Sequence, residues 1–365
     1  MTIAYVVGAR PNFVKMAPVL ARLRERLPGE RHVLIHTGQH YDPEMSAVFF
    51  EELGVPDPDY LLGVGSASHA VQTARIMKRL EPVLERERPS LVIVPGDVNS
   101  TLAATLVAAK LGISLAHIES GLRSFDRSMP EEINRIVADC FSDYLFLHCD
   151  EAIENLRAEG IARERMHFVG NTMIDSLLAV EARFRARNAS ERFSVRPREY
   201  LLVTLHRPTL VDGPLLNQVI ESLNTVASEL PVVFPVHPRT RKMMAGIETA
   251  PGVHLSKPLS YLDFLSLEAD AAAVLTDSGG VQEETTFLGV PCFTLRDATE
   301  RRGTVRLGTN RLRGLDPSRI VDLIGSLSSD PIPPTEPPPL WDGKAAERTA
   351  EILAETLSNK GHAVA

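Results

Sequence analysis

The alternation of short apolar runs with amphipathic stretches restricts the possible folds of this chain more than any other feature. In the first half, apolar runs lie at residues 2–7, 32–37, 91–95, 113–118 and 144–147. Between them lie helical patterns, such as 14–27 and 68–87, and the apolar positions from Val71 to Leu84 fit one helical face. Continuous apolar strands separated by helices predict a parallel sheet covered on both faces.

The same pattern starts again in the second half, with runs near 200–205, 231–236, 253–255, 272–276 and 291–295. A chain of 365 residues exceeds the roughly 250–300 residues at which a single core stops growing. We therefore predict an α/β protein with two doubly wound Rossmann-like domains, residues 1–170 and 171–365, the second opening with a helix to about 187. A cleft between them would face the carboxyl ends of both sets of strands. The proline-rich segment 331–339 is typical of an extended connector, and 343–357 favours a final amphipathic helix.

Charge and composition exclude several classes of function. The net charge of −8 disfavours a nucleic-acid surface, and no apolar run reaches the ~20 residues that cross a membrane. The first residues enter a strand pattern without a basic leader, so we expect a cytoplasmic protein. Cys140, Cys149 and Cys292 lack paired spacing, which argues against a zinc site or disulfides. We expect all three to be small buried apolar residues.

A glycine and an arginine follow the first strand, in the segment from Gly8 through Arg10 to Asn12, with Lys15 a helical turn further on. A strand-to-helix turn of this kind suits an anionic ligand, because the first amides of the helix point at the same spot. In the alternative reading, Gly8 serves only the tight turn and Arg10 is a surface charge.

Acidic residues follow two later strand candidates of the first half, at 91–95 and 113–118. Asp97 and Glu119 close two successive strand candidates, and Glu131 begins a helix. The carboxyl ends of neighbouring parallel strands meet at one edge of a sheet, where two carboxylates can serve as acid and base. Taken singly, Asp97 could cap a helix and Glu131 could pair with a helix dipole.

In the second half, Ser278-Gly279-Gly280 follows an apolar run and opens a helical pattern. Two glycines at a helix start let backbone amides approach a phosphate. Glu284, a turn into that helix, is placed to accept hydrogen bonds from a ribose diol. His206 could be a core histidine, but His206-Arg207 at a strand end together with the cradle favours a diphosphate ligand.

These segments form an ordered set. They read Gly8-x-Arg10-Pro11-x3-Lys15, Gly96-Asp97, Glu119-x-Gly-Leu-Arg123, Pro130-Glu-Glu-x-Asn-Arg135, His206-Arg207, Asp277-Ser-Gly-Gly-x-Gln-Glu-Glu284 and Arg296-Asp-x-Thr-Glu-Arg301. The set resembles the non-hydrolysing UDP-N-acetylglucosamine 2-epimerases, from the first strand to about residue 357. The resemblance implies a glycosyltransferase-B type fold, a homodimer, a UDP-sugar partner in the cleft and a last helix returning to the first domain.

The resemblance also assigns residues. It implies four catalytic residues: Asp97, Glu119, Glu131 and His206. It implies substrate contacts at Arg10, Lys15, Arg123, Arg135, His237, Phe264, Ser278, Gly279, Gly280, Glu284 and Arg301. Gln39, His40, Glu132 and Arg207 are possible regulatory residues, because some relatives bind a second UDP-sugar as an activator, in a pocket that His237 also matches. Ser68-His69 replaces the relatives' Arg-Gln pair there, and Pro208-Thr209 and Arg302-Gly303 also depart from the common pattern.

The chemistry implied is reversible inversion at carbon 2 of UDP-N-acetylglucosamine to give UDP-N-acetylmannosamine. UDP would leave by anti-elimination to a 2-acetamidoglucal and add back after protonation on the other face. This needs an acid, a base and phosphate donors, but no metal or redox cofactor. Which carboxylate is acid and which is base stays open. The alternatives are a UDP-sugar glycosyltransferase of the same fold, a hydrolysing epimerase, or a non-enzymatic sensor. The pathway could be polysaccharide or specialised-metabolite biosynthesis.

Overall fold

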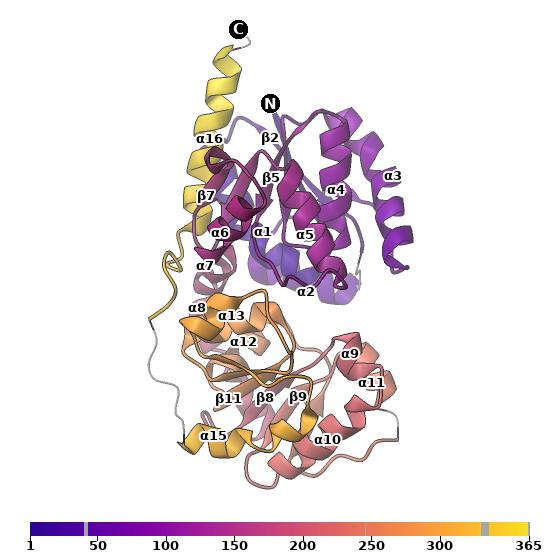
Figure 1. Ribbon diagram of the computed structural model, residues 1–365, viewed down its shortest axis with the longest axis vertical. Helices are drawn as coiled ribbons and strands as arrows, with labels where there is room; N and C mark the ends of the chain where they lie inside the picture. The colour runs from indigo at the N-terminus through magenta and orange to yellow at the C-terminus, as the bar shows by residue number, and fades with distance from the viewer. Residues whose placement is uncertain (40–42, 245, 330–335, 364–365) are drawn as a thin grey trace. The chain divides into compact units, whose positions relative to one another are not determined.

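The computed structural model describes residues 1–39, 43–244, 246–329 and 336–363 and divides the chain into two α/β units (Figure 1). Unit 1 comprises Met1–Ala179 and Pro339–Ala365, and unit 2 comprises Val180–Pro338. The helix expected over 171–187 is two helices, α7 (Thr172–Ala179) and α8 (Glu181–Arg185). Because α7 packs against α1 of unit 1, the division falls at Ala179–Val180, nine residues beyond the expected boundary at 170.

Unit 1 is built on a parallel sheet of seven strands in the order β3-β2-β1-β4-β5-β6-β7. The strand bounds are β1 Thr2–Val7, β2 Arg31–His36, β3 Tyr60–Leu61, β4 Leu91–Pro95, β5 Ser114–Ile118, β6 Tyr144–Leu147 and β7 Met166–Phe168. The central strands are buried on both faces, as at Val92 and Ile93 of β4. Their continuous apolar sequence is therefore explained by helices on both sides.

The helices of unit 1 are α1 Arg10–Arg26, α2 Pro43–Leu53, α3 His69–Glu87, α4 Asn99–Lys110, α5 Pro130–Phe141, α6 Glu151–Ala158, α7 and α16 Ala345–Ala363. Helix α4 packs against both α3 and α5 and is buried around most of its circumference, which explains its weak amphipathic pattern. Helix α16 packs against α1 and α7. None of the described helices combines the length and apolarity needed to cross a membrane.

Unit 2 repeats the plan with a six-stranded parallel sheet in the order β10-β9-β8-β11-β12-β13. The strands are β8 Leu201–Thr204, β9 Val232–Pro235, β10 Val253–Ser256, β11 Ala273–Thr276, β12 Cys292–Thr294 and β13 Asn310–Leu312. Its helices are α8, α9 Pro208–Val211, α10 Leu215–Val226, α11 Pro238–Met243, α12 Tyr261–Ala269, α13 Gly279–Leu288, α14 Arg302–Arg306 and α15 Leu323–Ser329.

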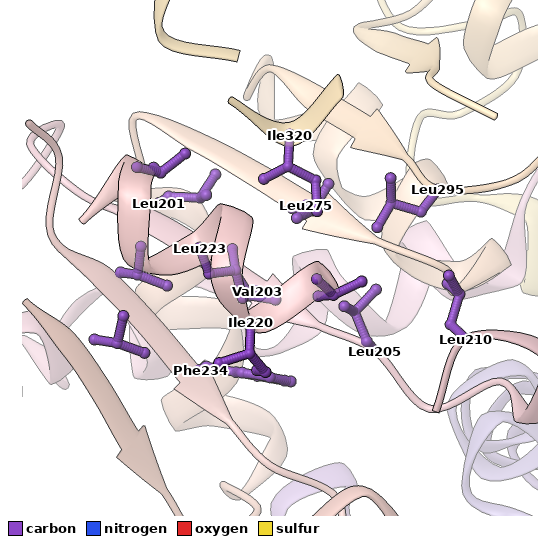
Figure 2. Close-up of a cluster of buried hydrophobic side chains, with 14 of the residues drawn as sticks. Leu201, Val203, Leu205, Leu210, Ile220, Leu223, Phe234, Leu275, Leu295 and Ile320 are labelled. Carbon is purple, nitrogen blue, oxygen red and sulfur yellow. The ribbon is translucent and has the colours of Figure 1, made fainter. Parts of the chain in front are cut away.

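The largest core cluster of unit 2 lies between α10 and its sheet. Figure 2 shows Ile220 and Leu223 of α10 beside Val203 of β8 and Phe234 of β9. All four side chains are fully buried. In α10 the buried positions recur every three or four residues, so one face of the helix meets the sheet.

The structure also departs from several expected boundaries. Helix α1 begins at Arg10 rather than near residue 14, because Pro11 is tolerated in a first turn, where the amides lack helical partners. Strands β3 and β13 were not expected, since the first has two residues and the second contains the polar residues Asn310 and Arg311. Helix α16 runs from Ala345 to Ala363 rather than from 343 to 357.

The expectation for the cysteines was wrong for two of the three. Cys292 is buried in β12, but Cys140 is exposed and Cys149 is partly exposed. Cys140 lies in the last turn of α5 beside the exposed Phe141. Low polarity alone therefore did not identify the solvent-facing side of this helix.

Asp175 of α7 connects two distant parts of unit 1. Its carboxylate accepts hydrogen bonds from the amides of Ala345 at 3.2 Å and Ala346 at 2.6 Å, at the start of α16. Replacing Asp175 with alanine should therefore lower the free energy of unfolding by about 1–2 kcal/mol, the usual cost of removing a helix cap. Urea unfolding would measure this, with the exposed Asp57→Ala as control. An unchanged midpoint would contradict the capping role.

Candidate active site

The polar segments of both units follow strands at the place where the strand order reverses. This reversal lies between β1 and β4 in unit 1, and between β8 and β11 in unit 2. Ligands of doubly wound sheets bind outside the carboxyl ends of the strands at such points. At the reversal points lie Gly8 and Arg10 after β1, Asp97 after β4, His206 after β8 and Ser278 after β11. Glu119 follows β5, the strand next to β4.

The turn between β1 and α1 is held by Asn12. Its Oδ1 accepts the amides of Gly8 at 3.1 Å and Ala9 at 3.2 Å, and its Nδ2 donates to the carbonyl of Pro95 at 3.2 Å. A Cβ at Gly8 would overlap the hydroxyl of Ser100, so glycine is required by packing. Arg10 is partly exposed, with its guanidinium 5.1 Å from the centroid of the Phe49 ring.

Glu119 is buried beside a lysine. Lys15 Nζ of α1 lies 2.6 Å from Glu119 Oε1, and each side chain is only 5% exposed. The backbone of Glu119 has φ of +65°, in the left-handed region that a residue with a Cβ rarely adopts. Such strain persists where surrounding bonds impose it, and it often marks functional positions.

Asp97 is held by two neighbouring residues of α5. Arg135 forms an ion pair with its carboxylate, and Asn134 Nδ2 donates to its carbonyl at 2.8 Å. Arg135 also contacts Glu132 Oε2 at 2.7 Å. The Asp97 side chain keeps 18% of its surface exposed, so it can still meet a ligand.

A buried cluster of ionisable side chains is bonded to the backbone next to these carboxylates, at Gly96 and Gly121. Asp139 of α5 contacts His117 Nδ1 at 2.7 Å and Arg123 at 2.7 Å, and all three side chains are at most 1% exposed. Arg123 also binds Glu159 at 2.6 Å. Burial would raise the pKa of Asp139, but His117 and Arg123 outweigh it and hold the pKa below its usual value.

Glu131 has a different setting in the first turn of α5. It is partly exposed, and among the residues that the structure describes its carboxylate has no hydrogen-bond or ion-pair partner. Three predicted catalytic carboxylates of unit 1 therefore occur in three environments. Glu119 pairs with lysine, Asp97 pairs with arginine, and Glu131 is bonded to no cation of the part of the chain that the structure describes.

Three basic residues that were expected to bind substrate are paired with carboxylates of unit 1. Lys15, Arg123 and Arg135 are 4%, 2% and 1% exposed, and each is engaged by a carboxylate of its own unit. The sequence pattern gave their positions but not their partners. Asn12, Asn134, His117 and Asp139 were not assigned roles, although Asn12 and Asn134 lie within the quoted segments.

The possible regulatory residues are also engaged internally. Gln39 Oε1 accepts from the amide of Ser100 at 3.1 Å and from its hydroxyl at 2.8 Å. Glu132 accepts the amides of Ser124 and Phe125, each at 2.9 Å. Burial would raise the pKa of Glu132, but Arg135 and these amides hold it below its usual value. His40 lies outside the described residues.

In unit 2, Asp277 fixes the segment after β8. Its Oδ2 accepts the amides of His206 at 2.9 Å and Arg207 at 2.8 Å, and its Oδ1 lies 2.9 Å from His206 Nδ1. Asp277 is fully buried, whereas the His206 side chain is 47% exposed. With Nδ1 directed at Asp277, the other ring nitrogen of His206 is the one that can serve a ligand.

The predicted phosphate cradle has the expected local form. Ser278 is the N-cap of α13, and Gly279 and Gly280 form its first turn with partly exposed backbone. A Cβ at Gly279 would overlap the guanidinium of Arg301. Arg301 is itself paired with Glu300 and lies 3.4 Å from Glu283. The cradle is therefore lined by a guanidinium packed against the glycine backbone.

Glu284 lies one turn below the cradle. It is 4% exposed and accepts a hydrogen bond from Tyr261 Oη at 2.9 Å. Burial raises its pKa to about 7, and the neighbouring Glu283 adds to this shift. Glu268 of α12 is fully buried, and neither of its carboxyl oxygens has a hydrogen-bond partner among the described residues. Burial and Glu284 raise the pKa of Glu268 well above its usual value.

The remaining predicted contacts lie in the same unit. Phe264 of α12 is partly buried and packs against the core cluster containing Tyr200 and Val281. His237 follows β9 and is exposed. Within residues 1–39, 43–244, 246–329 and 336–363, no three His, Cys, Asp or Glu side chains gather as they would around a metal ion.

The two parallel sheets, each with its reversal point, define an α/β protein of the glycosyltransferase-B type. Residues 24–354 match the family model described as UDP-N-acetylglucosamine 2-epimerase. The chain belongs to this family, which confirms the resemblance found in its motifs.

Relatives with assigned names match along most of the chain. A UDP-N-acetylglucosamine 2-epimerase of Methanococcus maripaludis is 40% identical over 337 residues, covering 88% of this chain and 90% of the relative. A Pseudomonas aeruginosa protein named UDP-2,3-diacetamido-2,3-dideoxy-D-glucuronate 2-epimerase is 40% identical over 361 residues, covering 97% of this chain and 100% of the relative. Members that resemble this chain equally thus have different named substrates.

Solved structures agree with the fold. The UDP-GlcNAc 2-epimerase of Methanocaldococcus jannaschii, in complex with UDP-GlcNAc and UDP, has a TM-score of 0.90 and 38% identity, covering 97% of this chain and 100% of that chain. The glycotransferase of kitacinnamycin has a TM-score of 0.55 and 15% identity, covering 98% of each chain. The second likeness concerns the fold alone.

Proposed function

We propose that this protein interconverts UDP-N-acetylglucosamine and UDP-N-acetylmannosamine without hydrolysing either. The observation that carries the proposal is the set of three carboxylates in unit 1, Asp97, Glu119 and Glu131, each in a different electrostatic setting. Family membership supports the reaction class. The named complex of the Methanocaldococcus jannaschii relative supports the choice of sugar nucleotide.

In the proposed reaction, a base removes the proton on carbon 2 while the bond from carbon 1 to the diphosphate oxygen breaks. The electron pair of that bond leaves with UDP, and carbons 1 and 2 become the double bond of 2-acetamidoglucal. In the return step, carbon 2 takes a proton on its other face and UDP oxygen attacks carbon 1. Water is not consumed, so the reaction is reversible.

The residue settings suit these steps. Lys15 and Arg135 pair with the carboxylates of Glu119 and Asp97, and carboxylates at these positions can accept a proton or stabilise positive charge at carbon 1. Glu131, the third carboxylate, is partly exposed and is the remaining candidate for transferring a proton to or from carbon 2. In unit 2, the cradle amides and His206 would hold the diphosphate and stabilise it as it leaves.

The test follows carbon 2 directly. The protein is incubated with UDP-N-acetylglucosamine in deuterated water, and the sugar is followed by NMR. Deuterium at carbon 2 in a mixture of gluco and manno sugar nucleotides is expected. Stoichiometric free UDP would instead indicate a hydrolysing epimerase, and turnover only with an added acceptor would indicate a glycosyltransferase.

A second substrate is worth a parallel assay, because the Pseudomonas aeruginosa relative is named for a diacetamido glucuronate. UDP-2,3-diacetamido-2,3-dideoxy-D-glucuronate is therefore incubated under the same conditions. A higher kcat/KM for this sugar nucleotide would replace the proposed substrate while keeping the same chemistry. We further propose that the protein acts as a homodimer in the cytoplasm, and light scattering in solution tests the oligomeric state.

The setting of Glu284 predicts how nucleotide binding depends on pH. A ribose diol donates best to an ionised carboxylate, and burial raises the pKa of Glu284 to about 7. The affinity for UDP-N-acetylglucosamine should therefore rise between pH 6 and 8, by up to about tenfold per pH unit below the pKa. Calorimetric titration of the sugar nucleotide, whose diphosphate is a diester, avoids the terminal phosphate proton of UDP. Glu284→Gln should bind weakly with a flat profile, so an unchanged slope in that variant would contradict the prediction.

A further inference from the structure

Two buried side chains of unit 1 are bonded to both strand ends that carry predicted catalytic carboxylates. His117 lies on β5, two residues before Glu119, and Asp139 lies near the end of α5. Both are completely buried. Neither residue has a part in the reaction steps described above.

The first bond reaches the strand end that carries Asp97. His117 Nε2 lies 2.7 Å from the carbonyl oxygen of Gly96, which can only accept, so this nitrogen carries a proton. Gly96 immediately precedes Asp97 and has φ of +61°. Its own amide donates to the carbonyl of Ile118 at 2.9 Å, so the ends of β4 and β5 are tied together at this point.

The second bond reaches the segment that carries Glu119. Asp139 Oδ2 accepts the amide of Gly121 at 3.0 Å and lies 2.7 Å from Arg123. The amide of Ser120 donates to the carbonyl of Phe146 at 3.1 Å. These bonds follow directly after Glu119 and can hold its left-handed backbone, which is disfavoured for any residue with a Cβ.

A hydrogen bond between His117 and Asp139 joins these two contacts into one link between the strand ends. His117 Nδ1 and Asp139 Oδ1 are 2.7 Å apart, a distance typical of a hydrogen bond with a charged partner. The chain of contacts therefore runs from Gly96 through His117 and Asp139 to Gly121. All of it is inaccessible to solvent, so water cannot replace a lost bond.

We propose that His117 and Asp139 are positioning residues that set the placement of Asp97 relative to Glu119. The proposal rests on the proposed function, in which these carboxylates act on the adjacent carbons 1 and 2 of one sugar. A displacement of about 1 Å in such an arrangement costs on the order of 10²-fold in rate. Helix α5 adds a further contact to Asp97, because Arg135, one turn before Asp139 on this helix, pairs with the Asp97 carboxylate.

Two substitutions at His117 separate the two ends of the link. In His117→Gln the amide nitrogen takes roughly the place of Nε2, so the bond to Gly96 is kept and that to Asp139 is lost. In His117→Asn the amide nitrogen takes roughly the place of Nδ1, with the opposite result. Asp139→Asn weakens the link from the other side. His32→Gln serves as the control, since His32 is a partly buried histidine at the opposite end of the sheet.

Two measurements are made on each variant. We expect kcat to fall by about 10- to 100-fold while KM changes less than twofold, with wild-type kcat in His32→Gln. Hydrogen exchange gives a readout that does not depend on activity. His117→Asn should accelerate exchange of the amides of residues 96–98, whereas His117→Gln and Asp139→Asn should accelerate exchange of those of residues 120–122.

Folded variants with wild-type kcat would overturn the proposal, as would exchange that rises uniformly across unit 1. Should His117→Asn not fold, His117→Gln and Asp139→Asn decide the question alone. Failure of the proposed function has a different signature. In that case the wild-type protein introduces no deuterium at carbon 2, while the exchange pattern of the variants still shows whether the link holds the two segments.

Discussion

Replacing Glu119 with glutamine is expected to lower the turnover of UDP-N-acetylglucosamine by about 10³-fold, within the range of 10²–10⁴ typical of a lost acid or base. Asp97→Asn should do the same. Neither glutamine nor asparagine can accept the proton of carbon 2 or neutralise positive charge at carbon 1. Rate measurements by NMR in deuterated water would give the loss of both exchange and epimerisation.

Binding of UDP provides the complementary measurement for these two variants. Apart from Arg10 at the start of α1, the predicted UDP contacts lie in unit 2, on α12, on α13 and beside β8, so the Kd for UDP should stay within about twofold. Glu154→Gln, at an exposed position of α6, is the matched control and should behave like the wild type. Loss of UDP affinity in Glu119→Gln, or preserved turnover, would contradict the role of this carboxylate.

Glu119→Gln also leaves Lys15 without its carboxylate in a buried site. Breaking a buried ion pair from one side can destabilise a protein by about 3–5 kcal/mol. Thermal unfolding of the variant should therefore accompany the kinetics. A double variant, Lys15→Met with Glu119→Gln, removes both charges and should recover stability without recovering turnover, which separates the two effects.

The second large effect is expected at the phosphate cradle. In Gly279→Ala the new methyl group would overlap the Arg301 guanidinium and must displace it or the first turn of α13. The amides of that turn would then meet the diphosphate less closely. We expect the affinity for UDP to fall about 10- to 100-fold, which corresponds to about 1.4–2.8 kcal/mol.

Gly213→Ala is the control for this substitution. A Cβ at Gly213 meets no atom of the described residues within 4 Å, and its φ is not in the left-handed region, so binding should be unchanged. Calorimetry with UDP gives both values. Unaltered affinity in Gly279→Ala would show that the diphosphate does not use the start of α13.

The fold class was predictable because buried parallel strands have an unusually plain signal. Val92 and Ile93 must be apolar on both faces of the sheet, and the comparisons confirm the two doubly wound domains and the family. Short or polar edge strands lack this signal, as β13 illustrates. Its Asn310 is buried, and its amide nitrogen donates hydrogen bonds to Gln282 Oε1 at 3.0 Å and Thr304 Oγ1 at 3.1 Å. No local sequence pattern reveals these partners.

The sequence predicted which polar segments follow the strand ends, but not which side chains pair there. Glycines, acids and basic residues after apolar runs marked segments that lie at the carboxyl ends of the strands, because the carboxyl ends of parallel strands meet at one edge. Partners distant in sequence could not be predicted. Lys15 and Glu119 are 104 residues apart, and only the packing of α1 onto the sheet brings the ammonium to the carboxylate. The assigned catalytic and binding roles stay predictions until the variants are measured.

The last helix has a consequence for how the protein is made. Unit 2 occupies a continuous stretch, whereas unit 1 needs α16 from the end of the chain, which contacts α1 through pairs such as Arg26 with Glu351 at 3.1 Å. During synthesis, all of unit 2 can emerge and fold while the surface of α1 and α7 that α16 covers is still exposed. A chain truncated before Ala345 would therefore contain a complete unit 2 but an incomplete unit 1.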